Sequence, residues 1–460
     1  MQYDYIIVGA GPSGLITAWL LAKNNKKCLI IDREETIGGC HRVRRINGYF
    51  AEHGPRVYLS NYVNTKSILK DMNINFDDIF TQMQVSFTNI GGFDIWKIPI
   101  LDILKVIITF IIFLIYPYFA KTITVKEYMD YMDFNPQVKI YFDRFCRTTD
   151  GMGAERYTLY QFLELVNQYI FVKYYQPKEP NDILLFPKIR EQLDKTNNID
   201  FMLNTKITKL NHDNNQIINI ITNSGNVLTA HHYILAIPPK NIFEIIPYNA
   251  FNLTQEIVND ISYNTYINVT FHWKDDLKLK SSMGFGLTSW GLMFFILSDY
   301  MKFKESKTVI SSCISILDEL SDYTKKTANQ STKQELIQET FRQLKISYPD
   351  LPKPDNVIVE DIEYKNNQWT VNDGGYIRNK QKYTIDFQSP IYHNLYTVGT
   401  HNDRSEFAFT SFESAVTNAI VFCNQKETTQ FPLISQWTIR NILIIVLLII
   451  FFIYYFAKNQ

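Results

Sequence analysis

The stretch Gly9-Ala10-Gly11-Pro12-Ser13-Gly14 stands near the start of the chain, between two segments of different periodicity. It follows the β-branched and aromatic run 3–8 and precedes a run of apolar residues at helical spacing. A strand, a turn with three glycines and a helix are typical of a dinucleotide-binding unit. In such a turn Gly9 permits the tight bend, Gly11 lets the backbone approach a pyrophosphate, and Gly14 allows close packing of helix on strand.

An acidic residue follows at the end of the next predicted strand. Asp32 lies 18 residues after Gly14, directly behind the apolar run 28–31. A carboxylate at this place accepts hydrogen bonds from the ribose hydroxyls of an adenosine and would repel a 2'-phosphate. The pattern therefore favours an adenine dinucleotide, NAD or FAD, over a glycine turn that binds no ligand.

A second pair of glycines favours FAD over NAD. Gly38 and Gly39 would face the pyrophosphate from the opposite side, and Arg42 would add positive charge there. At this point the sequence resembles the flavin-containing amine oxidase superfamily, which includes phytoene desaturases and protoporphyrinogen oxidases. The paired glycines match that family's second glycine motif, and Glu52-His53-Gly54-Pro55-Arg56 is similar to its flavin-lining segment.

Later segments extend the resemblance over nearly the whole chain ahead of a C-terminal apolar run. The stretch 204–207 resembles the strand whose backbone meets the adenine, and 233–239 resembles the Ala-x-Pro-Pro strand end. Gly399 and 412–415 are similar to the last flavin motif. The resemblance implies non-covalent FAD. The residues that we expect to bind it are Gly9, Gly11, Pro12, Ser13, Gly14, Asp32, Arg33, Gly39, Arg42, Gly54, Pro55, Arg56, Ile207, Gly399, Glu413 and Ala415.

The sequence also departs from the family pattern. Thr400 and His401 stand in the place of the family's acidic residue beside the ribityl chain, with Asp403 as the alternative for that contact. Amine oxidases usually carry a lysine beneath flavin N5 and a tyrosine in an aromatic cage, whereas this chain has Asn268 and Ser411 there. These replacements make amine oxidation less favoured than hydride removal from an apolar substrate.

Four residues are candidates for contact with the reacting atoms. His53 and Arg56 stand in the flavin-lining segment, where a purely structural role is an equal alternative. Asn268 takes the position of the family's lysine. Tyr376 lies where the family often builds an active-site wall, although core packing is the favoured interpretation there.

Together these features predict an FAD-dependent oxidoreductase that removes a hydride from an apolar or amine small-molecule substrate to flavin N5. A first alternative is a non-redox flavoenzyme of the UDP-galactopyranose mutase type, which shares the nucleotide-binding half and a similar Gly-Pro segment. A second alternative is an FAD-binding membrane protein without activity, which the altered motif from Gly399 to Ala415 would explain.

Composition narrows the partners. The chain has 46 Lys and Arg against 46 Asp and Glu, so no basic excess indicates nucleic-acid binding. Its five cysteines are spread out with no C-x-x-C pair, which argues against a disulfide framework and a zinc site, and no other metal site is expected. No secretory signal precedes the first predicted strand, so we expect the catalytic part to face the cytosol.

The order of predicted elements indicates an α/β protein with a Rossmann-like FAD-binding domain built from discontinuous segments. We assign residues 1–60, 196–245 and 391–425 to this domain. The first and last segments contain strand, turn and helix patterns of a parallel sheet, with a helical run over 412–422 in the last, and the middle segment contains the predicted strands 201–210, 216–222 and 232–237. Residues 61–195 and 246–390 would form an α+β substrate domain. In this domain the stretch 124–128 resembles the start of one of the family's helices, and a charged helix is predicted from Thr332 to Lys345.

Two apolar runs bear on membrane attachment. Residues 442–457 carry no charge, and 438–457 is predicted to be a single C-terminal transmembrane anchor, with a buried helix as the alternative. The run from Val106 to Ala120 is too short to span a bilayer comfortably. A buried helix is its favoured interpretation, ahead of an interfacial helix and of a true span.

Overall fold

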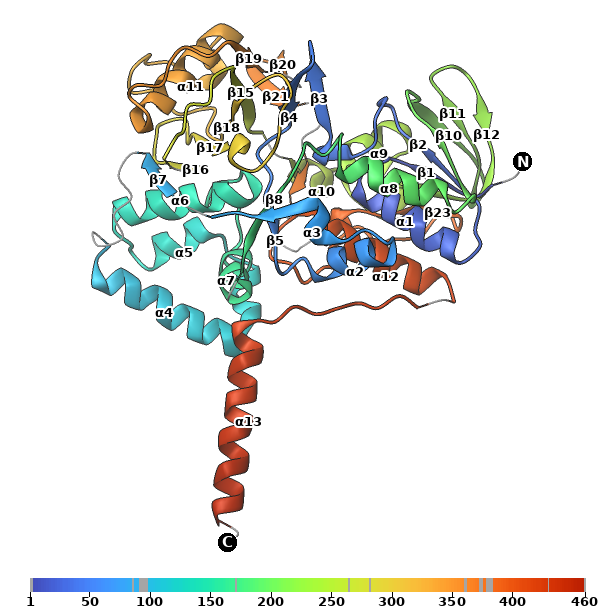
Figure 1. Cartoon of the computed structure of the whole chain (residues 1–460). Coiled ribbons are helices and arrows are strands. Elements are labelled where there is room, and N and C mark those ends of the chain that lie inside the picture. The colour runs from blue at the N-terminus through green and yellow to red at the C-terminus, as the bar shows by residue number, and fades with distance from the viewer. Residues whose placement is uncertain are drawn as a thin grey trace.

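A parallel five-stranded sheet brings together parts of the chain that are far apart in the sequence (Figure 1). The structure is a computed structural model that describes residues 3–84, 87–90, 98–169, 172–263, 265–280, 283–359, 362–371, 375–377, 384–428 and 430–458. All pairings in this sheet are parallel. Its strands, in order across the sheet, are β23 (Leu395–Thr397), β13 (Ala230–Leu235), β1 (Tyr3–Val8), β2 (Cys28–Ile31) and β9 (Ile199–Met202).

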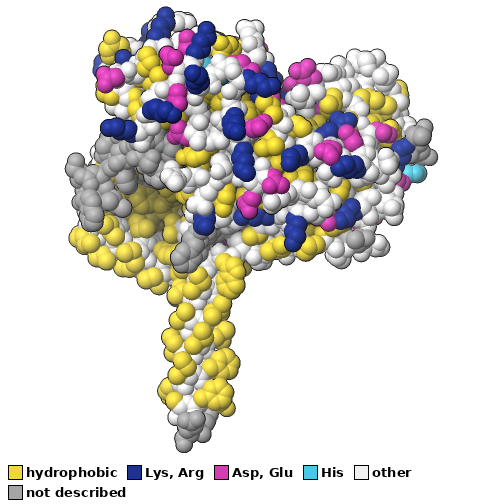
Figure 2. All heavy atoms as spheres, viewed as in Figure 1, with side chains coloured by type: hydrophobic (Ala, Val, Ile, Leu, Met, Phe, Trp, Pro, Cys, Tyr) yellow, Lys and Arg dark blue, Asp and Glu magenta, His cyan; other side chains and the backbone are white. Residues whose placement is uncertain are grey.

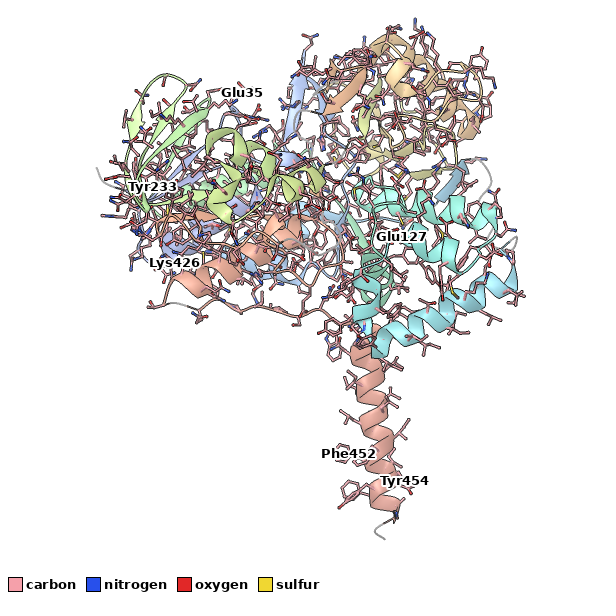
Figure 3. All side chains as sticks on the ribbon, turned by 180° about the vertical axis from the view of Figure 1, so that it is seen from behind. Glu35, Glu127, Tyr233, Lys426, Phe452 and Tyr454 are labelled. Carbon is pink, nitrogen blue, oxygen red and sulfur yellow. The ribbon has the colours of Figure 1, made fainter. Side chains whose placement is uncertain are left out.

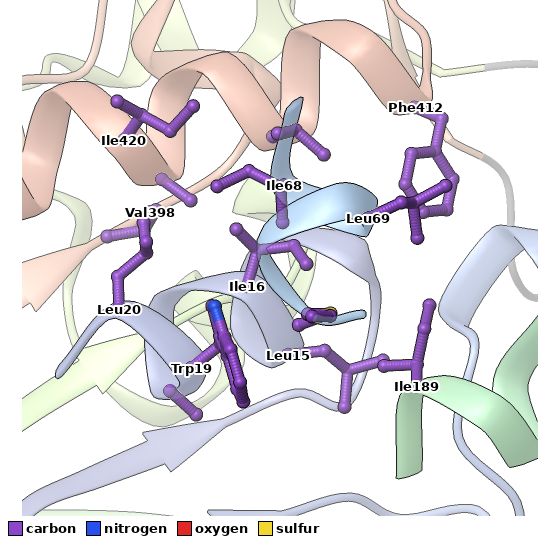
Figure 4. Close-up of a cluster of buried hydrophobic side chains, with 14 of the residues drawn as sticks. Leu15, Ile16, Trp19, Leu20, Ile68, Leu69, Ile189, Val398, Phe412 and Ile420 are labelled. Carbon is purple, nitrogen blue, oxygen red and sulfur yellow. The ribbon is translucent and has the colours of Figure 1, made fainter. Parts of the chain in front are cut away.

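Each face of the sheet packs against its own layer. Tyr5 and Ile7 of β1 point into one apolar cluster and Ile6 and Val8 into another, as the two-residue period of a strand requires. The helices of the first cluster, among them α1 and α12, contribute side chains such as Leu15, Ile16, Trp19, Ile68 and Ile420 (Figure 4). These helices are α1 (Pro12–Lys23), α2 (Val63–Asp71), α3 (Phe76–Ile79), α8 (Leu185–Asp194) and α12 (Phe412–Lys426). The other face carries β10 (Ile207–Asp213), β11 (Gln216–Thr222), β12 (Val227–Leu228), α9 (Pro239–Ile245) and α10 (Gln255–Asp260).

A second sheet of six strands forms the core of the other half of the molecule. Its central strands β15 and β18 are buried along their whole length. The sheet consists, in order, of β19 (Asn356–Ile358), β15 (Ile267–Trp273), β18 (Thr308–Ile314), β17 (Met293–Ile296), β16 (Met283–Gly286) and β7 (Phe87–Ile90), and α11 (Lys333–Ser347) packs beside it.

Other short strands pair outside these two sheets. They are β3 (Val43–Ile46) with β4 (Tyr49–Glu52), β5 (Tyr58–Leu59) and β6 (Phe80–Gln82) with β8 (Tyr174–Pro177), β14 (Ser262–Tyr263) with β22 (Tyr376–Ile377), and β20 (Ile362–Lys365) with β21 (Gln368–Val371). Short 3-10 turns include η1 (Gly39–His41), η3 (Pro117–Lys121) and η7 (Thr400–Asn402).

A helical layer lies beneath the second sheet in Figure 1, and the last helix projects from it. Thr124 and Glu127 form a capping box at the start of α5, which is the helix start that the sequence predicts there. The layer consists of α4 (Ile100–Ile115), α5 (Val125–Tyr131), α6 (Pro136–Asp150) and α7 (Leu159–Gln168), and the projecting helix is α13 (Ile439–Lys458).

The structure confirms the mixed α/β fold with a Rossmann-like sheet and corrects two expectations. The predicted strand 201–210 is broken, because Asn204 has a φ of 52° and its N–H donates to Glu34 O at 3.0 Å. The expectation of a buried helix from Val106 to Ala120 is wrong. The helix α4 begins earlier, and only Thr109, Phe113 and Ala120 of that run are buried.

Candidate functional site

The first glycine turn is shaped by close backbone contacts. A Cβ on Gly9 would lie 2.4 Å from Ala236 O, and a Cβ on Gly14 would lie 2.0 Å from Gly9 O. Gly11 is different, because its φ of −78° suits any residue and its nearest neighbour would be Gly39 Cα at 3.6 Å. Two of the glycines are therefore required by packing, whereas Gly11 keeps the space above the turn free.

The second glycine pair lies against the first turn. Gly38 donates its N–H to Ala10 O at 2.8 Å, which ties the two turns together. Gly39 has a φ of 55°, and a Cβ there would lie 2.9 Å from Gly11 Cα. Gly11 and Gly39 both line a cavity, and α1 begins at the same place, so the cavity beside the two turns fits a pyrophosphate.

Asp32 lines the cavity on the side where the adenosine is expected. Its Oδ2 accepts from Ala10 N–H at 2.7 Å, and its Oδ1 accepts from Glu34 N–H at 2.9 Å. Arg42 Nη2 lies 3.4 Å from Oδ1. Burial raises the pKa of Asp32 above its usual value, while Arg42 and the two backbone donors act in the opposite direction. The carboxylate is thus held in place at the end of β2, where ribose hydroxyls would reach it.

One cavity of about 1080 Å³ runs from the glycine turns to the six-stranded sheet. That volume slightly exceeds the range of about 300–1,000 Å³ for ligand pockets, and it leaves room for a dinucleotide together with a substrate. The donor set and the glycine cradle therefore fit FAD. Of the residues predicted to bind FAD, those that line the cavity are Gly9, Gly11, Pro12, Ser13, Asp32, Arg33, Gly39, Arg42, Pro55, Arg56, Ile207, Gly399 and Ala415.

The remaining three predicted FAD residues lie behind the cavity wall. Gly14 packs on Gly9, as described above. At Gly54 a Cβ would lie 2.5 Å from the ring of Tyr266, so this glycine makes room for an aromatic side chain. Glu413 accepts from Asn64 N–H and Thr65 N–H, both at 2.8 Å, and so caps the start of α2.

The C-terminal motif places a neutral histidine at the cavity. His401 lines it, and its Nε2 lies 2.5 Å from Thr397 Oγ1. Burial lowers the pKa of His401 to about 3, so the ring is uncharged at neutral pH. Thr400 and Ser411 also line the cavity, and Ser411 caps the start of α12, whose N-terminus is aimed at the same space. The predicted alternative Asp403 is not among the lining residues.

The structure separates the four catalytic candidates into two pairs. Arg56 and Tyr376 line the cavity, and Arg56 Nη2 donates to Cys40 O at 2.5 Å. The other two do not line it. His53 packs its ring on Tyr266 at 5.0 Å, and Asn268 bonds to neighbouring hydroxyls inside the second sheet.

Aromatic side chains at the far end of the cavity were missed by the sequence reasoning. Tyr141, Phe142 and Phe145 come from α6, Phe162 comes from α7, and Tyr266 precedes β15. The aromatic character of 125–175 is visible in the sequence, but core packing explains it equally well. Only the arrangement of α6 and α7 against the second sheet shows that these rings face the cavity.

Comparison with known proteins agrees with this geometry. The flavin-containing amine oxidoreductase family matches residues 187–420, and an NAD(P)-binding Rossmann-like domain matches residues 7–72. The chain belongs to the flavin-containing amine oxidoreductase family. Membership confirms the predicted FAD-dependent oxidoreductase and its non-covalent FAD.

Solved structures of two oxidases share the fold of this chain. A putrescine oxidase bound to putrescine has a TM-score of 0.69 and 14% identity, over 93% of this chain and 99% of that one. Cyclohexylamine oxidase from Brevibacterium oxydans IH-35A has a TM-score of 0.66 and 13% identity, over 93% and 100%. The UDP-galactopyranose mutase of Mycoplasma genitalium is 37% identical over 63 residues, which is 13% of this chain and only 16% of that protein.

Proposed function

We propose that this protein removes a hydride from a largely apolar small molecule. The observation that carries the proposal is the aromatic end of the cavity, where Tyr141, Phe142, Phe145 and Phe162 surround the space beyond the predicted flavin site. Such a wall favours an apolar or aromatic substrate over a sugar nucleotide. An amine substrate remains compatible with the family but is less favoured, because Asn268 is bonded within the sheet, away from the cavity.

The residues of the chain supply binding and orientation. Gly11 and Gly39 would admit the pyrophosphate, and Asp32 would hold the adenosine ribose. Bound FAD supplies a hydride acceptor at N5. Arg56 and Tyr376 border the cavity and would orient the substrate, while the aromatic wall excludes water from it. His401 is neutral and adds no charge beside the flavin.

The test uses the full-length chain purified in detergent. We expect flavin absorbance bands, and anaerobic addition of a polyene, a tetrapyrrole or an amine from a screening set should bleach them. A colourless protein that cannot be reconstituted with FAD would refute the proposal. Turnover only after chemical reduction of the flavin would favour the mutase type, and a flavin that no compound reduces would favour a binding protein without activity.

We also propose the division of the chain that the sequence predicts. The parallel sheet supports an FAD-binding domain of residues 1–60, 196–245 and 391–425, and the six-stranded sheet with its helical layer supports a substrate domain of 61–195 and 246–390.

We further propose that α13 is a membrane anchor, with the catalytic part in the cytosol. The helix has 20 residues, a mean hydropathy of 2.5 and no buried residue. At about 1.5 Å per residue, such a helix covers the roughly 30 Å hydrocarbon core of a bilayer. Phe452 and Tyr454 point away from the helix axis, and no other helix or strand lies beside them (Figure 3). Resistance of the full-length chain to alkaline extraction of membranes would support the anchor, and release into the supernatant would refute it.

A further inference from the structure

Helix α4 exposes a continuous apolar face. Leu101, Leu104, Ile108, Ile111, Ile112 and Ile115 recur every three or four residues, and their side chains are between 45% and 81% exposed. Figure 2 shows hydrophobic side chains gathered along the lower edge of the body and down the projecting helix. A soluble monomer rarely shows so many large aliphatic side chains together, so this face is expected to meet an apolar partner.

The opposite face of α4 fixes its rotation. Thr109 Oγ1 lies 2.7 Å from the hydroxyl of Tyr128, and Asp102 Oδ2 accepts from Asn135 N–H at 3.0 Å. Phe113 is fully buried in the helical layer. Because these contacts hold the helix on α5 and on the turn before α6, the apolar face cannot turn inward without breaking them.

The same face adjoins the start of α13. Arg440 Nε donates to Leu114 O at 3.0 Å, and its guanidinium lies 5.2 Å from the ring centroid of Phe113. In Figures 1 and 3, which view the molecule from opposite sides, α4 runs along the lower edge of the body and ends beside the top of α13. A bilayer crossed by α13 would therefore reach the level of α4.

Aromatic and basic side chains mark this junction. Tyr116, Tyr118 and Trp437 are 57%, 64% and 67% exposed. Lys121 Nζ lies 5.2 Å from the ring centroid of Tyr118. Tyrosine, tryptophan and lysine at one level are typical of a membrane–water interface.

We propose that α4 lies in the interface of the bilayer as a second lipid contact of this protein, with its exposed aliphatic face inserted below the headgroups. The proposal rests on the membrane anchor proposed above, because α13 brings the lipid to this face. Amphipathic helices that lie in the membrane plane bury such a face in the acyl boundary. The fixed rotation of α4 and its contact with Arg440 would hold the catalytic body in one orientation against the membrane.

The test measures depth in the bilayer with spin labels on the full-length chain. Separate variants Ile108→Cys, Ile112→Cys, Phe452→Cys and Tyr323→Cys are labelled and reconstituted into phosphatidylcholine vesicles. The native chain, treated in the same way, gives the background from its own cysteines. Phe452 reports on the anchor, and Tyr323, which is 72% exposed, is the control for an aqueous position. Retained FAD absorbance shows that each variant is folded.

For each label we compare the relaxation enhancement by oxygen, which concentrates in lipid, with the enhancement by a water-soluble nickel complex. We expect the oxygen-to-nickel ratio to be several-fold higher for the labels at positions 108 and 112 than for the label at position 323. If position 452 is in lipid while 108 and 112 behave like 323, α4 does not insert and the anchor stands. If 108 and 112 are shielded from both reagents and show spin–spin broadening, a second copy covers the face and the proposal is overturned. If 452 is also aqueous, both the anchor and the α4 contact are refuted, whereas the proposed chemistry is untouched.

Discussion

Gly11 is the residue at which space for the cofactor can be tested without disturbing the fold. Its backbone suits any side chain, and an added Cβ would meet nothing closer than Gly39 Cα at 3.6 Å. We expect Gly11→Val to fold and to bind FAD weakly, because the side chain would occupy part of the cavity where the pyrophosphate is expected. The dissociation constant for FAD, measured by titration of the flavin-free protein, should rise at least about tenfold, which corresponds to a loss of about 1.4 kcal/mol in binding.

The matched control is another glycine far from the cavity. Gly225→Ala adds a methyl group that meets nothing within 4 Å, although its φ of 83° makes the change mildly strained. This variant should bind FAD with the native affinity. Native FAD affinity in Gly11→Val would show that the cavity beside the two glycine turns does not hold the pyrophosphate.

His272 links stability to pH. It is buried on β15, its Nε2–H donates to Phe50 O at 2.8 Å, and its Nδ1 accepts from Ser306 Oγ at 2.9 Å. Burial is the main reason why the pKa of His272 falls from 6.5 to about 4. A depressed histidine pKa means that the unfolded chain binds more protons than the folded one between these values. The neutral His272 therefore contributes up to about 3 kcal/mol to the free energy of unfolding. This contribution is complete above pH 6.5 and is lost as the pH falls to 4.

The measurement is the melting temperature in detergent at pH 7.5, 5.5 and 4.5. The native chain should lose more thermal stability between the first and last pH than His272→Gln, which cannot titrate there. His231→Gln, at an exposed position on β13, serves as the control and should follow the native curve. Equal acid sensitivity of the native chain and His272→Gln would contradict the assignment.

For single residues, a sequence motif shows which residue type a position needs, but it does not show which group that residue contacts. The motif that contains Gly54 and the one that contains Glu413 both point to the flavin, yet Gly54 faces Tyr266 and Glu413 caps α2. A glycine is needed wherever another group comes close, and a motif does not say which group that is. The same limit hid Tyr266, whose neighbours in the fold lie more than 100 residues away in the sequence.

Elements were predicted well where a local pattern and its caps agree. The helix from Thr332 to Lys345 is found as α11 with Thr332 as its cap, and the helix after Ser411 is found as α12. The run that contains α4 was misjudged for a physical reason. Apolar residues occur on all sides of this helix, so periodicity cannot separate the face that packs on Tyr128 and Tyr160 from the face left exposed.

The joint between α4 and α13 depends on Arg440. Its guanidinium donates to Leu114 O, covers Phe113, and lies 3.7 Å from the buried carboxylate of Glu164. Arg440→Ala should weaken this joint by about 1–3 kcal/mol, because Glu164 keeps its burial and loses its cation. We expect faster protease cleavage in the connecting segment 427–438 with no release from the membrane.

Lys458→Ala provides the comparison for Arg440→Ala. Lys458 is at the opposite end of α13, where its Nζ lies 6.0 Å from the ring centroid of Tyr454. Removing this cation should leave cleavage of the connecting segment unchanged. Identical cleavage rates for Arg440→Ala and the native chain would show that the joint does not depend on the guanidinium.

For the whole molecule, the sequence predicts a mixed α/β fold with a parallel sheet, but it does not predict how the second half of the molecule is built. The parallel sheet was expected, since its strands are β-branched runs next to glycine and proline turns. The order of strands in the six-stranded sheet cannot be predicted from the sequence, because its strands β7 and β16 pair across nearly 200 residues and no short-range signal connects them. The cavity lies between these two halves, so its aromatic end is a property of the assembly.

The two proposed lipid contacts can be separated by truncation. A chain that ends before Trp437 lacks α13 but keeps α4, so it should still sediment with phosphatidylcholine vesicles, and salt should release little of it because the contact is mainly apolar. Adding Ile108→Glu and Ile112→Glu to that truncated chain should lower its vesicle partition at least about tenfold, since each aliphatic side chain contributes roughly 1.5–3 kcal/mol when fully buried. The matched control is the truncated chain with Leu320→Glu and Tyr323→Glu, two exposed positions remote from α4, which should bind as the parent does.

If the truncated parent stays in solution, α13 is the only lipid contact of consequence and the orientation of the body against the membrane must come from the Arg440 joint.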